Sequence, residues 1–135
     1  MPNINHKGRS KYDNCVILSR FDMRTEAYTH LSVYGRAALL EFLYRFNGAN
    51  NGEIQISVRQ LGKALNCGKN KAGDVFLELQ DKGWIKYNKK GSFDWKTHTN
   101  KEASGSGRAS TWFLTNRPTL NKSATKEYVY WKAKN

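Results

Sequence analysis

The side chains that most often carry catalysis or bind metals are scattered along this sequence. Catalysis needs converging groups, such as a nucleophile beside a base, paired carboxylates or a metal with its ligands. The cysteines and histidines stand singly, without the spacing of metal ligands, at Cys15, Cys67, His6, His30 and His98. The acidic residues of the central region form no catalytic set either: Glu41, Glu53, Asp74, Glu78 and Asp81. We therefore expect no enzyme, no metal site and no cofactor.

Basic side chains give the strongest chemical signal. The 135 residues include 23 lysines and arginines against 11 acidic residues, a formal net charge of +12. Such a charge attracts a polyanion and speeds its capture, without specifying a fold. DNA, RNA and an anionic membrane surface all fit, and a solvated basic face without a partner is the remaining alternative. The charge is uneven, because residues 21–52 hold three basic and three acidic side chains, whereas residues 88–117 hold six and two.

The expected compartment follows from what the sequence lacks. No basic-then-apolar signal segment opens the chain, and no apolar run approaches the roughly 18 residues of a membrane span. Both thiols are expected to stay reduced. These features predict a cytoplasmic, nucleoid-associated protein with no membrane partner.

Apolar periodicity predicts the helices that must position the basic residues. Four helices are expected, at residues 21–30, from the N-cap Ser32 to Asn47-Gly48, at residues 58–65 after the N-cap Ser57, and at residues 69–82 before the stop Gly83. The last of them has an inward stripe of Ala72, Val75, Phe76 and Leu79.

Short alternating stretches predict three strands, over residues 53–56, 84–87 and 111–115, with a long basic hairpin between the last two. The expected organisation is a basic arm (1–20), one domain (21–117) and a basic aromatic tail (118–135). The aromatic residues of the tail are Tyr128, Tyr130 and Trp131. Self-packing or dimerisation through this tail is favoured over stacking on single-stranded nucleic acid.

Two short helices across the turn at 66–68 form a helix-turn-helix unit, whose second helix fits a major groove about 12 Å wide. Residues 57–65 followed by 68–72 resemble the paired helices of bacterial winged helix regulators, and residues 77–85 resemble their passage from recognition helix to wing. Residues 45–54 with 112–115 are similar to small winged helix proteins of phages and plasmids. The resemblance covers about Leu31 to Thr115. It implies an α+β winged helix-turn-helix fold, with a three-helix core, a β-hairpin wing and basic terminal extensions.

The resemblance also implies a groove-facing set of residues, namely Lys69, Asn70, Lys71, Gly73 and Asp74. The inward stripe agrees, because it turns these positions away from the core. Asparagine can read adenine with two hydrogen bonds, and lysine can reach guanine or phosphate. Lysines in a first helical turn oppose the helix dipole, which favours a functional reason for them. A glycine inside a helix needs a reason, and for Gly73 two explanations stay open: close approach to DNA and close packing of the helix.

Further basic and polar residues are expected to hold phosphates without reading bases. They are Asn88, Lys89, Lys90 and Lys96 of the wing, Arg108 near its tip, and Arg59, Gln60 and Lys63 of the first paired helix.

The expected partner is double-stranded DNA bound by a homodimer, in transcription regulation or in replication or recombination of a mobile element. The alternatives are RNA binding and a phage or plasmid protein that inhibits a host complex, for example a nucleic-acid-guided defence complex.

Overall fold

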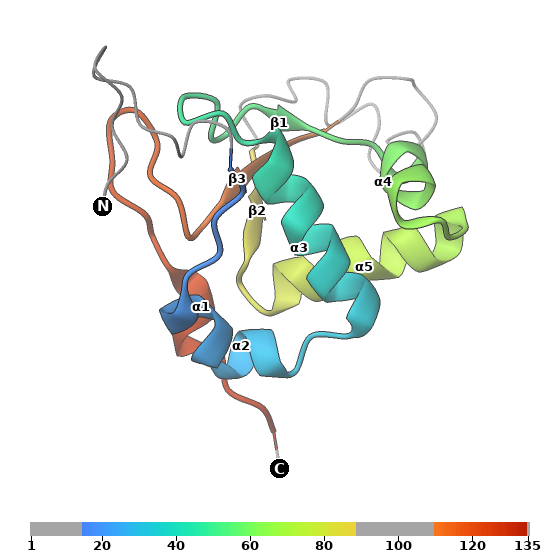
Figure 1. The fold of residues 1–135 in the computed structure, drawn as a ribbon, viewed down its shortest axis with the longest axis horizontal. Helices are drawn as coiled ribbons and strands as arrows, with labels where there is room; N and C mark the ends of the chain where they lie inside the picture. The colour runs from blue at the N-terminus through green and yellow to red at the C-terminus, as the bar shows by residue number, and fades with distance from the viewer. Residues whose placement is uncertain (1–14, 89–109, 135) are drawn as a thin grey trace.

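Helices and short strands form a small α+β domain, which a computed structural model describes over residues 15–88 and 110–134 (Figure 1). The described elements are α1 (Arg20–Arg24), α2 (Glu26–Thr29), α3 (Val33–Arg45), β1 (Ile54–Gln55), α4 (Val58–Leu65), α5 (Lys69–Asp81), β2 (Ile85–Tyr87), β3 (Thr111–Leu114) and the 3-10 helix η3 (Glu127–Tyr130). α3, α4 and α5 pack against one another. Within the two described ranges, no helix is long and apolar enough to cross a membrane.

Most predicted elements are present, and one is corrected. α4 occupies the predicted residues, α5 ends one residue before the predicted 82, and each strand is shorter than predicted by one or two residues. The prediction of a single helix over residues 21–30 is wrong, because α1 and α2 divide at Thr25. The Thr25 backbone is extended (φ −69°, ψ 154°), and its hydroxyl accepts a hydrogen bond from the N–H of Tyr28. Thr25 therefore ends one helix and caps the next.

The core forms where α3 and α5 meet the sheet. Phe42 of α3 packs edge to face on Phe76 of α5, with ring centroids 5.9 Å apart, and Phe76 stacks on Trp112 of β3 at 5.3 Å. All three rings are buried. Aromatic rings in these arrangements bury large apolar areas and prefer defined geometry. This cluster therefore fixes α3 and α5 against β3.

The three-stranded antiparallel sheet has the order β1-β3-β2, with the last described strand at its centre. Ile54 of β1 pairs with Trp112, and Ile85 of β2 pairs with Leu114. Both neighbours of β3 therefore depend on residues 111–114 for their hydrogen bonds. The sheet can therefore form only after residues 111–114 have packed between β1 and β2.

Gly83 ends α5, as predicted, and also leaves room for the tail. Its φ of +85° lies in the left-handed region that favours glycine. The N–H of Trp84 donates to the carbonyl oxygen of Leu79 at 2.9 Å, and the N–H of Gly83 donates to that of Gln80 at 3.0 Å, which is a Schellman motif. A Cβ at Gly83 would lie 2.9 Å from the backbone nitrogen of Tyr128. Both the turn and the tail therefore need a glycine here.

Tyr128 packs the tail against the domain. Its ring stacks on Trp84 with centroids 4.1 Å apart, and its hydroxyl donates to Oδ1 of Asp22 at 2.6 Å. Nδ2 of Asn116 donates to the other oxygen of Asp22 at 3.0 Å. Burial of the ring, and then the hydrogen bond to Asp22, raise the pKa of Tyr128 above its ordinary value. The prediction of a self-packing tail is confirmed at this residue.

Replacing Tyr128 tests this contact. Tyr128→Phe should lower the free energy of unfolding by about 1.5–3 kcal/mol at neutral pH, because the buried Asp22 loses a hydrogen-bond donor. The raised pKa means that the folded chain holds the phenol proton more tightly than the unfolded chain. This stability is present below about pH 10 and is lost as the pH rises above that value. Urea unfolding at a series of pH values measures this. The free energy of unfolding of the variant should lack the fall above about pH 10 that the wild-type chain shows.

Tyr130→Phe is the matched control, because Tyr130 lies two residues away and is 79% exposed. It should change the free energy of unfolding by less than about 0.5 kcal/mol. Equal losses in the two variants would contradict the role given to the contact between Tyr128 and Asp22.

Candidate nucleic-acid interface

α4 begins with a capping box and presents basic side chains on the surface. Oγ of Ser57 accepts a hydrogen bond from the N–H of Gln60 at 3.0 Å, and Oε1 of Gln60 accepts one from the N–H of Ser57 at 2.9 Å. Leu61 is fully buried in the core. Arg59 and Lys63, one helical turn apart, stay exposed. The cap and the buried leucine therefore fix where these two cations lie.

A three-residue turn sets α5 against α4, as predicted. Asn66 adopts the left-handed conformation (φ 57°, ψ 47°), which asparagine tolerates better than most residues. The N–H of Cys67 donates to the carbonyl oxygen of Gly62 at 2.9 Å. A Cβ at Gly62 would lie 2.9 Å from the carbonyl oxygen of Cys67. A larger residue at this position would therefore push the turn away from α4.

The amino end of α5 differs from those of the other four described α-helices. α1, α2, α3 and α4 each begin at a serine or threonine whose hydroxyl accepts a backbone N–H. α5 begins at Gly68 without a side-chain cap, and its first turn has no acidic residue. It carries Lys69 and Lys71 instead. Backbone N–H groups and positive charge at a helix start suit an anion such as phosphate.

The predicted groove-facing side chains lie on the outside of α5. Lys69, Asn70, Lys71 and Asp74 are exposed. The predicted inward stripe is buried: Ala72, Val75, Phe76 and Leu79. Nζ of Lys71 lies 5.3 Å from the ring centroid of Tyr34 on α3. This cation therefore sits on the α3 side of α5, and Asn70 lies on the outer side.

Charge is divided along the helix pair. Residues 57–71 hold four basic and no acidic side chains, whereas residues 72–81 hold three acidic and no basic ones. Of the three carboxylates, Glu78 accepts hydrogen bonds from the N–H and the hydroxyl of Ser32, at 2.8 and 2.7 Å. Asp74 and Asp81 are exposed. The basic surface therefore covers α4 and the first turn of α5, and ends there.

Gly73 faces open space. A Cβ built on it would meet no heavy atom within 4 Å in the part of the chain that the structure describes. Close helix packing, one of the two explanations that the sequence allowed, is thus not the reason for this glycine. Close approach to DNA, the other explanation, stays a prediction.

Two of the predicted DNA contacts also have structural roles. The side-chain oxygen of Gln60 closes the capping box of α4, a role that the spacing Ser-x-x-Gln could have indicated. Nδ2 of Asn88 donates to the carbonyl oxygen of Gly52 at 2.5 Å, and Asn88 is partly buried. The remaining wing residues, Lys89, Lys90, Lys96 and Arg108, lie outside the described residues, so their phosphate contacts stay predictions.

The sequence analysis missed Leu77 as a candidate contact. This side chain is 65% exposed and lies four residues after Gly73 and three after Asp74, on the same outer face of α5. Helical spacing was the signal that could have found it. An apolar side chain at this place is suited to the methyl group of thymine or to an apolar protein surface.

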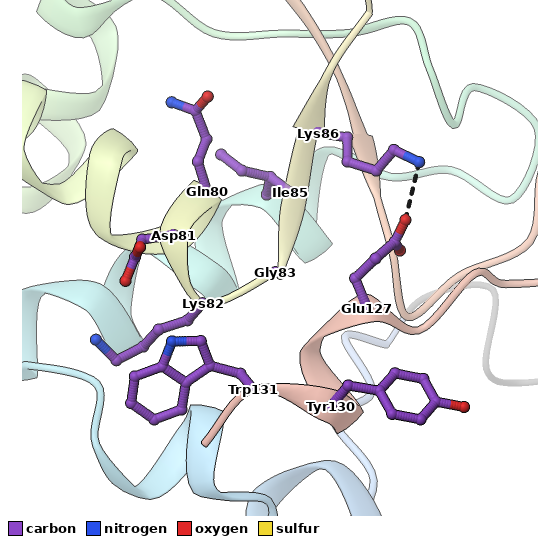
Figure 2. A pocket seen from close by; sticks show the side chains of 9 residues that line it. All are labelled: Gln80, Asp81, Lys82, Gly83, Ile85, Lys86, Glu127, Tyr130 and Trp131. Carbon is purple, nitrogen blue, oxygen red and sulfur yellow. Dashed lines mark hydrogen bonds and ion pairs between the residues drawn. The ribbon is translucent and has the colours of Figure 1, made fainter. Parts of the chain in front are cut away.

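A shallow hollow of about 400 Å³ lies at the other end of α5, between β2 and η3 (Figure 2). Nζ of Lys82 lies 4.7 Å from the ring centroid of Trp131, and Nζ of Lys86 lies 2.9 Å from Oε2 of Glu127. Burial raises the pKa of Glu127, but hydrogen bonds from Thr125 and Lys86 outweigh it and lower the pKa. The tail therefore packs at the carboxyl end of α5, away from Lys69 and Asn70.

No three histidine, cysteine or acidic side chains come together as a metal site in residues 15–88 and 110–134. The chemistry that the helix pair offers is that of hydrogen-bond donors and positive charge directed at an anion. Comparisons with protein-family models, with curated proteins and with solved structures found no match to this chain.

Replacing Gly73 separates folding from binding at this surface. Gly73→Ala should raise the free energy of unfolding by about 0.5–1 kcal/mol, because alanine favours a helix and meets no neighbour there. Thermal unfolding followed by circular dichroism measures the change. Gly62→Ala is the control and should destabilise the chain, since its Cβ would meet the carbonyl oxygen of Cys67. A destabilised Gly73→Ala would show that the position is not open.

Proposed function

We propose that this chain binds double-stranded DNA as a winged helix protein, with α5 in the major groove. The observation that supports this most directly is the exposed, uncapped and basic amino end of α5, which follows the turn at Asn66. The described order α3-β1-α4-α5-β2-β3 is compatible with a winged helix, in which the strands flank the segment 88–110. The role that fits is transcription regulation, or replication or recombination, on a mobile element in the cytoplasm.

Positioning on the duplex would come from the basic part of the helix pair. Arg59 and Lys63 of α4 would hold phosphates along one strand, while Lys69 and the free N–H groups of α5 would hold a phosphate at the groove edge. These contacts bind any sequence and release counterions, so they make affinity depend steeply on salt.

Sequence preference would come from the outer side of α5. Asn70 can donate to and accept from adenine, and Asp74 can accept from the amino group of cytosine. Gly73 lies between them and has no side chain to hold the helix away from the bases. The carboxylate of Asp74 would be favourable beside the amino group of cytosine but would be repelled by a phosphate. Asp74 would therefore restrict the positions that α5 can take in the groove.

A protein target is the second candidate, and the outer face of α5 beyond its first turn favours it. Asp74, Leu77 and Asp81 are exposed there and are acidic or apolar. Such a surface suits the complementary face of another protein, for example a host complex that the chain inhibits. Weak, sequence-independent duplex binding would favour this function over the first.

Asn70→Ala tests base reading. The variant should lose about 1–3 kcal/mol of preference for a selected cognate duplex and should keep its affinity for random duplex, because the asparagine contacts a base edge. Selection from random DNA identifies the cognate site, and fluorescence anisotropy measures both affinities. Equal losses on the two duplexes would refute the assignment of Asn70.

Lys69→Gln tests phosphate binding and has a distinctive pair of effects. Affinity for all duplexes should fall, and the slope of log affinity against log salt should become shallower by about 1. Thermal stability should instead stay equal or rise slightly, because a cation leaves the positive end of a helix dipole. Lys122→Gln is the control, since Lys122 is exposed in the tail segment. An unchanged slope for Lys69→Gln would remove the amino end of α5 from the interface.

A further inference from the structure

The outer face of α3 exposes apolar side chains in the part of the chain that the structure describes. Val33 is 82% exposed, Leu40 is 45% exposed and Tyr44 is 71% exposed, and Ala37 between them is partly exposed. The opposite face of the same helix is buried in the core through Ala38, Leu39 and Phe42. α3 therefore has a second apolar face, which residues 15–88 and 110–134 leave largely exposed.

The spacing of these residues is that of a helix–helix seam. Steps of four, three and four residues separate Val33, Ala37, Leu40 and Tyr44, which is the alternation of the a and d positions in a heptad. This pattern places all four side chains in one narrow line along the helix. We name Val33, Ala37, Leu40 and Tyr44 the α3 stripe.

We propose that the α3 stripe binds the α3 stripe of a second copy of this chain, with the two helices parallel about a two-fold axis. A two-fold contact joins the same patch on both copies, so it needs a surface that complements itself. A line of apolar residues at heptad spacing has this property. The proposed DNA contacts lie outside the stripe and stay available in the dimer.

Charges at the two edges of the stripe favour the parallel arrangement. Arg36 lies along one edge and Glu41, five residues later, lies along the other. In parallel helix pairs these two positions meet across the seam, so Arg36 of each copy would face Glu41 of its partner. An antiparallel pair would bring each edge against its own counterpart, and the opposite charges would not meet.

The two charged side chains differ in how firmly they are held. Nη2 of Arg36 donates to the carbonyl oxygen of Thr29 at 3.0 Å, and the guanidinium lies 4.8 Å from the ring centroid of Tyr28. Oε1 of Glu41 is 4.0 Å from Nε of Arg45, which is a loose pair. The arginine is therefore fixed at its edge, and the glutamate can reach a closer partner.

The expected dimer is weak in free solution. α3 has 13 residues, which gives a contact only about 20 Å long, at the small end of specific interfaces. Two copies on adjacent half-sites of one duplex would associate more readily, because the DNA raises their effective concentration.

Sedimentation equilibrium of the full chain without DNA tests the interface. Leu40→Glu should raise the dissociation constant of the dimer at least tenfold. Leu120→Glu is the control for the same change of side chain, because Leu120 is an exposed leucine, at 76%, that lies outside the stripe. It should leave the constant unchanged. A wild-type chain that stays monomeric at the highest soluble concentration, or equal effects of the two variants, would overturn the proposal.

Charge reversal tests the parallel orientation. Arg36→Glu and Glu41→Arg should each weaken self-association, since like charges then face each other across the seam. An equimolar mixture of the two variants should form a heterodimer, because both edges regain opposite charges. That heterodimer would also show that Arg36→Glu still folds. A mixture that associates no better than either variant alone would overturn the parallel pairing. The measurement needs no DNA, so its failure leaves the proposed DNA binding untouched.

Discussion

The carbonyl oxygen of Cys67 approaches Gly62 so closely that the turn between α4 and α5 has little freedom. The left-handed backbone of Asn66 makes this approach possible, and the hydrogen bond from Cys67 to Gly62 closes it. The direction of α5 relative to α4 is fixed by these few atoms. The exposure of Lys69 and Asn70, the burial of the inward stripe and the contact of α5 with α3 all follow from that direction.

The division of charge along residues 57–81 limits what this surface can do. A recognition helix that lay deep in a groove along its whole length would bring Asp74 and Asp81 close to phosphates. The basic residues instead cover α4 and the start of α5, so under the proposed function α5 would enter the groove by its amino end. Glu78, the third acidic residue of α5, is directed at α3 instead, where it accepts hydrogen bonds from Ser32.

Elements whose ends are set by neighbouring residues could be predicted from the sequence. Contacts between residues far apart in the sequence could not. α4 was predicted to the residue because Ser57 and Asn66 mark its ends by short-range chemistry. The exposed set on α5 followed from its buried stripe. The division at Thr25 was missed because a threonine inside a polar stretch gives no strong break. The role of Tyr128 depends on Asp22 and Asn116, 106 and 12 residues away in the sequence, and spacing cannot indicate such a meeting. The comparisons with known proteins add no support to the sequence resemblance, so the proposed function rests on the geometry of α4 and α5.

The central place of β3 and the stacking of Tyr128 on Trp84 bear on the order in which the chain becomes stable during synthesis. The helix pair leaves the ribosome well before β3. Tyr28 contacts the ring of Trp84 edge to face, but the ring that stacks on Trp84 belongs to residue 128 and is made much later. A nascent or prematurely ended chain would thus leave one face of Trp84 uncovered and both β1 and β2 unpaired, beside an already basic surface. Such a chain would be a target for chaperones and proteases. Synthesis of residues 111–128 is therefore the step after which β1 and β2 are paired and the face of Trp84 is covered.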